Sequence, residues 1–235
     1  MSFSATIDRL FYSGYSDNWD NTLFRQRIQV CLTSEATILD LGAGAGRVPQ
    51  MNFRGLCQQV CGLDPEESVL KNRYLDSAKV GSAESIPWPD ATFDLVFSAN
   101  VLEHLANPRA VFNEVLRVLK PGGAFLIKTP NRLHYVAVLS TLLPHRIHVA
   151  VNNWRGRAES DTFPTYYRAN SQRALKELGR SFHSVCVEPI EGRPEYARQG
   201  VLAILYPLAL LWERAVNRFE FLSCFRVILI AKLVK

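Results

Sequence analysis

Cysteine is scarce in this chain and shows no pairing pattern. The five cysteines are odd in number, and no two of them form a C-x-x-C pair. A disulfide framework or a zinc knuckle is therefore disfavoured, and a reducing compartment is predicted. The first residues also lack the basic segment and the long apolar stretch of a secretory signal. These absences predict a cytoplasmic protein with no metal site.

Long apolar runs are missing as well. The uncharged run Val201–Trp212 has twelve residues. As a helix it would span ~18 Å, whereas the hydrocarbon core of a bilayer is ~30 Å thick. We therefore expect no transmembrane span. The run is interpreted as a core helix, a dimer contact or an interfacial membrane helix, within an apolar helical insert at about 198–218. Pro207 would kink such a helix unless a helix begins there.

Acidic residues are scarce in one half of the chain. Residues 129–235 hold 15 Lys+Arg and 8 Asp+Glu, whereas residues 1–128 hold 12 and 14. The net charge of +5 therefore comes from the second half. Such a basic half indicates an anionic partner (a phosphorylated acceptor, a membrane surface or nucleic acid) or an ordinary solvated basic surface.

Apolar runs alternate regularly with helical patterns before residue 130. Strands are expected at Thr37–Leu41, Gln59–Leu63, Lys79–Gly81, Phe93–Ser98 and Ala124–Thr129. Helices are expected at residues 18–32 with Asp17 as the N-cap, across Arg47–Leu56, from Pro65 to Lys71, and from Asn107 to Leu119. Such alternation predicts a parallel sheet with helices on both faces.

The alternation breaks beyond Pro130. Residues 130–169 are irregular in pattern and rich in aromatic and basic side chains. A helix at Ser171–Leu178 and strands at Ser184–Val187 and Phe225–Val234 are expected to follow.

Glycines occur at every second position at the end of the first expected strand. Gly42, Gly44 and Gly46 let the backbone approach a ligand closely and tolerate positive φ. A dinucleotide-binding loop has the spacing G-x-G-x-x-G, and here Arg47 stands at the position of its third glycine. The loop therefore predicts a nucleotide-like cofactor of a different kind.

Five segments in order carry a family resemblance. They are Ile38–Gly46, Gly62–Asp64, Ala83–Asp90, Phe93–His104 and Arg117–Gly123. With them the chain resembles the class I S-adenosylmethionine-dependent methyltransferases, in particular the type 11 small-molecule group, closely over about residues 35–130. The resemblance implies an α/β fold with a Rossmann-like, mostly parallel seven-stranded sheet, helices on both faces and an antiparallel last strand. It also implies one domain over residues 1–235, with an acceptor-recognition insert at about 130–169.

The resemblance assigns S-adenosyl-L-methionine as the cofactor. The residues expected to bind it are Asp40, Gly42, Ala43, Gly44, Gly46, Asp64, Pro65, Ser82, Ala83, Glu84, Asn100 and Val101. Asp40 and the Asn100 segment would meet the methionine end, and Asp64 would accept hydrogen bonds from the ribose hydroxyls. The Ser82 segment would face the adenine. Many relatives carry an acidic residue at the position of Ser82, so the contact with the adenine amino group is weaker here.

The acceptor side is less specific. His104 is the candidate general base, with a packing role as its alternative. His134, Tyr135, Arg155 and Arg168 are the candidate acceptor-binding residues, because arginine binds phosphate or carboxylate in a forked geometry and aromatics cover sugar or lipid faces. They suggest a sugar, a lipid-linked molecule or another anionic metabolite as the acceptor, with peripheral membrane contact through residues 201–212.

Three other functions are compatible with parts of the sequence. A nicotinamide-dependent oxidoreductase shares the fold, but Arg47 disfavours it. A non-catalytic S-adenosylmethionine-binding partner or scaffold protein is compatible with Ser82 and with the uncertain base. A nucleic-acid methyltransferase is disfavoured because Ser98–Asn100 stands where an N-P-P-[YF] motif would be.

Overall fold

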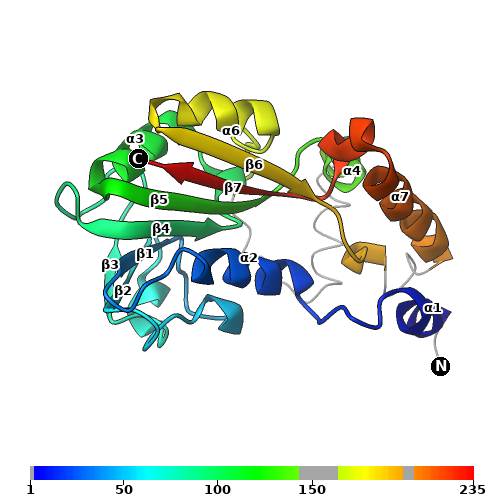
Figure 1. The fold of residues 1–235 in the computed structure, drawn as a ribbon, viewed down its shortest axis with the longest axis horizontal. Helices are drawn as coiled ribbons and strands as arrows, with labels where there is room; N and C mark the ends of the chain where they lie inside the picture. Colours follow the sequence, from blue (N-terminus) through cyan, green and yellow to red (C-terminus); the bar gives the residue numbers. More distant parts are fainter. Residues whose placement is uncertain (1–2, 143–163, 198–203) are drawn as a thin grey trace.

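The computed structural model describes residues 3–142, 164–197 and 204–235. These residues form one seven-stranded sheet with the strand order β3-β2-β1-β4-β5-β7-β6 (Figure 1). The strands are β1 (Thr37–Leu41), β2 (Gln59–Asp64), β3 (Ser77–Val80), β4 (Phe93–Ala99), β5 (Leu119–Pro130), β6 (Ser184–Ile190) and β7 (Ile228–Val234). The first five run parallel, and β7 runs antiparallel to both of its neighbours. The predicted mostly parallel sheet with an antiparallel last strand is confirmed.

Alternate residues of the central strands enter two hydrophobic clusters on opposite faces of the sheet. Leu39 and Leu41 belong to one cluster, and Ile38 beside them belongs to the other. Such strands are buried on both faces and so have nearly continuous apolar sequences, which is why they could be recognised.

Helices cover both faces, as predicted. The α-helices are α1 (Phe3–Phe11), α2 (Trp19–Gln29), α3 (Pro108–Val118), α4 (Tyr135–Leu142), α6 (Gln172–Leu178) and α7 (Tyr206–Arg218). The 3-10 helices are η1 (Pro49–Met51), η2 (Glu67–Lys71), η3 (Leu102–His104), η5 (Gly179–Ser181), η6 (Glu195–Ala197) and η8 (Glu220–Phe225). Helices α3 and α6 pack on one face, and α2 packs on the other.

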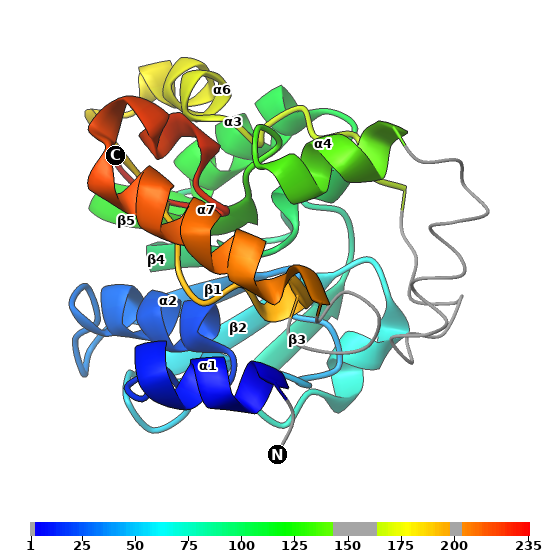
Figure 2. The ribbon, with the colours of Figure 1, turned by 90° about the vertical axis from the view of Figure 1, so that its right-hand side faces the viewer.

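A third layer lies beyond one end of the sheet. Helices α1, α4 and α7 occupy the end toward which the carboxyl ends of the parallel strands point (Figures 1 and 2). No helix in the described part of the chain is long and apolar enough to cross a membrane. Helix α7 has Pro207 in its first turn, as expected if a helix begins there.

One predicted helix is wrong, and another is present with 3-10 geometry. The segment Arg47–Leu56 contains only the 3-10 turn η1, because Pro49 and the positive φ of Gly55 interrupt a regular helix. The short helix predicted from Pro65 to Lys71 is present as the 3-10 helix η2, which begins at Glu67 and ends at Lys71. The connection from β1 to β2 therefore holds no α-helix.

Other boundaries also differ from the prediction. Asp17 is not the N-cap of α2; Asn18 stands there in the left-handed conformation, and Asp17 pairs with Arg193 at 3.0 Å. Part of the segment described as irregular is helical, because α4 begins at Tyr135. The last strand begins at Ile228 rather than Phe225, which ends η8.

Candidate functional site

The carboxyl ends of β1, β2 and β4 meet around one cavity. The cavity has a volume of about 290 Å³. Its lining includes Asp40, Gly42, Ala43, Gly44, Gly46, Asp64 and Asn100, all of which were expected from the sequence. The structure therefore brings together the glycine loop and the residues that follow the second and fourth strands.

The glycine loop needs its glycines for two different reasons. Gly42, Gly44 and Gly46 all have positive φ, at 83°, 48° and 72°. A Cβ atom at Gly42 would lie 2.2 Å from Cγ2 of Val101, so the loop packs directly against the segment after β4. A Cβ atom at Gly44 would meet nothing within 4 Å, so the backbone there borders open space. The loop is therefore packed on one side and open at Gly44, where its backbone can contact a ligand.

Asp64 holds the loop in place. Its Oδ2 atom accepts a hydrogen bond from the backbone N–H of Gly44 at 2.9 Å, and its Oδ1 atom accepts one from the N–H of Glu66 at 2.9 Å. A carboxylate oxygen has two acceptor sites, so both oxygens can also accept from ligand hydroxyls. Asp64 can therefore shape the loop and contact a ribose at the same time.

Asp40 is buried beneath the loop. Burial, and then the nearby Asp64 carboxylate, raise the pKa of Asp40 to about 8. The side chain is therefore mainly protonated at neutral pH. A positively charged ligand group beside it would favour the ionised form.

Asn72 braces the glycine loop from the side. Its Nδ2 atom donates to the carbonyl oxygens of Ala43 at 3.0 Å and Gly44 at 3.1 Å, while its Oδ1 atom accepts from the N–H of Tyr74 at 2.9 Å. The side chain is buried and lies against Gly46. Sequence patterns did not predict this residue, because an isolated asparagine in a polar stretch carries no recognisable pattern.

Arg25 of α2 supports the next part of the connection. Its Nη1 atom donates to the carbonyl oxygens of Gln50 at 2.7 Å and Asn52 at 2.6 Å. Its guanidinium group also lies over the ring of Phe53, at 4.7 Å from the centroid. Side chains from α2 and from the end of η2 thus hold the segment that lacks a helix.

A buried lysine lies behind the same cavity. Lys128 of β5 is fully buried, and its Nζ atom donates to Asp20 and to Asn21, both on α2. Asn21 lines the cavity. Lys128 therefore fixes the first turn of α2 against the site. No sequence pattern marks the pair of Lys128 and Asp20, whose members lie 108 positions apart.

A second cavity adjoins the first and shares Gly42 with it. It has a volume of about 270 Å³. Its lining includes Pro65, Ser82, Ala83, Glu84, Val101 and His104 from the expected set, together with Pro164 and Tyr166. Oγ of Ser82 accepts a hydrogen bond from the N–H of Glu84 at 3.1 Å, so its hydroxyl hydrogen can still be donated. All the expected cofactor residues therefore line one of two adjoining cavities.

The segment after β4 is tied to the segment before α6. Nδ1 of His104 lies 3.0 Å from the carbonyl oxygen of Pro164. The backbone N–H groups of Tyr166 and Tyr167 donate to the carbonyl oxygen of Glu103, at 2.7 Å and 3.2 Å. The backbone bonds tie the two segments together, and the contact with Pro164 orients the imidazole of His104 at the wall of the second cavity.

The candidate acceptor residues are dispersed. His134 is buried, its Nε2 atom lies 3.5 Å from Glu191, and burial lowers the pKa of His134 to about 4. Tyr135 packs edge-on against Trp212, at 5.3 Å between ring centroids. Arg168 donates to the carbonyl oxygen of Ala106. None of these side chains lines the two cavities described above. Arg155 lies outside the described residues.

Part of the chain is similar in sequence to known methyltransferases. Residues 39–127 match a family described as "Methyltransferase domain". A "Probable S-adenosylmethionine-dependent methyltransferase" of Mycolicibacterium smegmatis is 33% identical over 102 residues, which cover 42% of this chain and 39% of that protein. The chain thus spans about two fifths of the length of that relative.

Solved structures share the fold. An S-adenosylmethionine-dependent methyltransferase from Archaeoglobus fulgidus aligns over 100% of both chains with a TM-score of 0.61 and 15% identity. The [4+2]-cyclase SpnF aligns over 91% of this chain and 81% of its own, with a TM-score of 0.56 and 18% identity. At such identities these likenesses concern the fold.

Proposed function

We propose that this chain, whose residues 39–127 match the methyltransferase family and whose sheet has the fold of class I S-adenosylmethionine-dependent methyltransferases, transfers a methyl group from S-adenosylmethionine to a small anionic or glycosylated acceptor. The observation that carries the proposal is the convergence of the glycine loop, Asp64 and Asn100 on one cavity at the carboxyl edge of the sheet. Ligands of open α/β sheets bind at this edge.

The residues present fit S-adenosylmethionine. The open backbone at Gly44 suits close approach, and Asp64 retains acceptor capacity for ribose hydroxyls. We assign the Ser82–Glu84 wall of the second cavity to the adenine, and Asp40 and Asn100 to the methionine end. The bound cofactor supplies a methyl group already activated by the sulfonium. The chain therefore mainly has to position the acceptor and exclude water.

We assign His104 the role of general base for a hydroxyl acceptor. Its position at the wall of the second cavity and its Nδ1 contact with Pro164 support a fixed orientation. A carboxylate acceptor would need no base. Acceptor binding by Arg155, Arg168, His134 and Tyr135 stays a prediction from the sequence, because the three described side chains line neither cavity. Peripheral membrane contact near residues 201–212 would suit an acceptor held at a lipid surface.

Calorimetric titration of the full chain with S-adenosylmethionine and with NAD tests the cofactor. We expect binding of S-adenosylmethionine alone. Asp64→Asn should weaken it about tenfold, because a charge-assisted hydrogen bond contributes roughly 1.5–3 kcal/mol. Asp90→Asn is the matched control, since Asp90 is exposed and lines neither cavity. Binding of NAD without S-adenosylmethionine would favour a nicotinamide-dependent oxidoreductase instead.

An acceptor screen with labelled S-adenosylmethionine, using lipid and polysaccharide precursors, tests methyl transfer itself. On an accepted substrate, His104→Ala should lower kcat by ~10²-fold or more if the imidazole is the base. An unchanged kcat with a raised KM would leave His104 a positioning residue. Near-normal turnover would remove it from the reaction.

A second candidate is a protein of this fold that binds the cofactor without transferring its methyl group. The solved structure of the [4+2]-cyclase SpnF supports this candidate, because its name states a reaction other than methyl transfer for a protein of this fold. The two candidates separate on one result: tight S-adenosylmethionine binding with no label transferred to any precursor would support the second.

A further inference from the structure

Helices α1 and α7 form a unit with its own small core. Tyr12 and Tyr206 pack together at 6.4 Å between ring centroids, with Ile7 and Ala209 in the same cluster. The Tyr12 hydroxyl donates to Glu213 at 3.1 Å within this core. The inner sides of both helices are therefore occupied, and their outer sides face away from the sheet (Figure 2).

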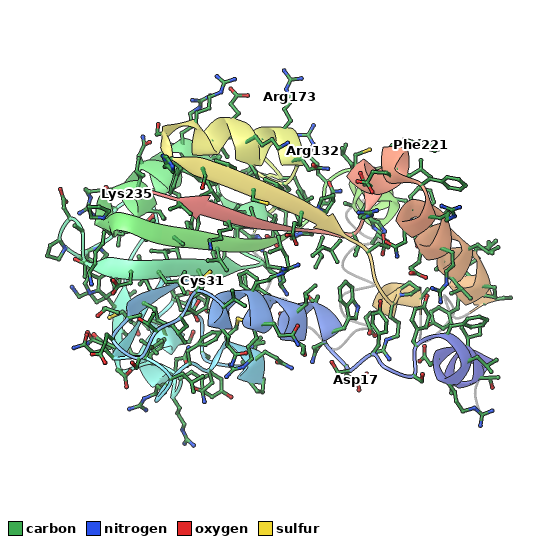
Figure 3. All side chains as sticks on the ribbon, viewed as in Figure 1. Asp17, Cys31, Arg132, Arg173, Phe221 and Lys235 are labelled. Atoms are coloured by element: carbon green, nitrogen blue, oxygen red, sulfur yellow. The ribbon has the colours of Figure 1, made fainter. Side chains whose placement is uncertain are left out.

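The outer side of α7 is apolar, although it is exposed. Ile204, Leu208 and Leu211 are 79%, 63% and 64% exposed. They recur at intervals of three or four residues, so they lie on one face of the helix and of the turn before it. Leu10 at the end of α1 is also exposed, and Phe221 of η8 is 77% exposed at the outer end of the layer (Figure 3). We call Ile204, Leu208 and Leu211 the apolar face.

Cations accompany the apolar face. Arg9, Arg214 and Arg218 are exposed on α1 and α7. The guanidinium of Arg214 lies 5.9 Å from the ring centroid of Phe11, which joins the two helices at this surface.

The acids of these elements are already engaged. Asp8 accepts a hydrogen bond from the Tyr206 hydroxyl, and Glu213 accepts one from Asn217 at 2.7 Å. Glu220 pairs with Arg226 at 3.1 Å. The surface therefore combines bulky apolar side chains with exposed arginines, whereas its carboxylates have partners within the protein.

We propose that the apolar face docks on the surface of an anionic lipid bilayer. Bulky apolar residues flanked by arginine are the features of helices that lie in the membrane interface. Leucine and isoleucine side chains would enter the acyl boundary, and Arg9 and Arg218 would meet anionic headgroups, whereas Arg214 pairs with Glu213 at 3.4 Å. Charge complementarity selects this occupant: anionic headgroups oppose the exposed arginines, whereas a second copy of the chain would bring a surface of the same positive sign.

Docking would give the proposed methyltransferase access to membrane-held acceptors. The layer of α1 and α7 stands beyond the end of the sheet at which the carboxyl ends of β1, β2 and β4 line the cofactor cavity, so docking turns that end toward the lipid (Figure 1). This consequence rests on the proposed function, whereas docking itself does not. The acceptor class that follows is a lipid-anchored molecule with its polar head at the membrane surface.

Flotation of the full chain tests docking, with vesicles of phosphatidylcholine alone and of phosphatidylcholine mixed with phosphatidylglycerol. We expect flotation with the anionic vesicles only, and less of it as salt is raised. The double variant Leu208→Gln, Leu211→Gln should bind at least about tenfold more weakly, because burying a leucine side chain contributes roughly 1.5–3 kcal/mol. Val30→Gln is the matched control, since Val30 is 85% exposed but lies at the end of α2.

Arg218→Glu provides a second variant that leaves the apolar side chains in place. It should weaken binding about fivefold or more, since each cation near an anionic surface contributes ~1 kcal/mol. Titration of every variant with S-adenosylmethionine checks folding and separates the two proposals: lost flotation with unchanged cofactor binding locates the effect at the face. Equal flotation by the original chain and these variants would overturn the inference. So would a dimer, seen by light scattering, that the leucine variant dissociates while no preparation binds vesicles.

Discussion

Replacing Asp40 with asparagine isolates the contribution of one buried carboxyl group to stability. Burial raises the pKa of Asp40 from 3.8 to about 8 in the folded protein, with Asp64 as the second cause. Between these two pH values the folded chain holds a proton that the unfolded chain has released. The stability contributed by the protonated form is complete below about pH 4 and is lost as the pH rises toward 8.

The size of this effect follows from linkage. Each pH unit within the window costs up to ~1.4 kcal/mol, so the loss between about pH 5 and about pH 8 amounts to ~3–4 kcal/mol. For a chain of this size that corresponds to a fall in Tm of about 10 °C. The asparagine of the variant stays neutral with nearly the same shape and lacks this dependence.

Urea unfolding of both proteins across this pH range provides the measurement. We expect the difference in the free energy of unfolding between Asp40→Asn and the original chain to grow by ~3–4 kcal/mol from about pH 5 to about pH 8, in favour of Asp40→Asn. Glu191, whose pKa burial also raises to about 8, titrates in both proteins and cancels in the difference. Parallel stability curves would refute the reasoning, because they would mean that Asp40 ionises alike in the folded and unfolded chains.

Three further predictions concern the contacts around the cavity. Asn72→Ala should weaken S-adenosylmethionine binding by up to about thirtyfold in calorimetry, since it removes two hydrogen bonds worth ~1 kcal/mol each. Leu70→Ala, at an exposed position of the preceding 3-10 helix, should leave the affinity unchanged. Equal affinities for Asn72→Ala and the original chain would contradict bracing by Asn72. Gly42→Ala should lower Tm and cofactor affinity, because its Cβ atom would lie 2.2 Å from Cγ2 of Val101. Adding Val101→Ala removes this clash and should recover part of both losses. If the double variant is no better than Gly42→Ala, the defect comes from the positive φ of the backbone alone. Lys128→Met should lower the free energy of unfolding, measured in urea, by ~3 kcal/mol, because Asp20 loses its cationic partner. Adding Asp20→Asn should restore part of this loss. Strictly additive losses would show that the two side chains do not interact.

The strands and the position of the site could be predicted because both follow from local pattern. Apolar runs such as Phe93–Ala99 are buried on both faces of the sheet, and a short, nearly continuous apolar run is typical of such a strand. Once the strands alternate with helices, topology alone brings Gly42, Asp64 and Asn100 to one edge.

The remaining features depend on contacts between distant parts of the chain. Asn72 reaches Ala43 across 29 positions, and Lys128 reaches Asp20 across 108. No local pattern marks either residue. The helix predicted after the glycine loop is wrong for a different, local reason. Pro49 is compatible with the first turn of a helix, so its position alone did not exclude one.

That missing helix has a consequence for motion. A regular helix would protect its backbone amides from solvent exchange through its own ladder of hydrogen bonds, whereas here the side chains of Asn72 and Arg25 hold the connection. Hydrogen exchange between β1 and β2 should accordingly proceed through local opening, well before the sheet itself opens. Binding of the cofactor against the glycine loop should then slow this exchange.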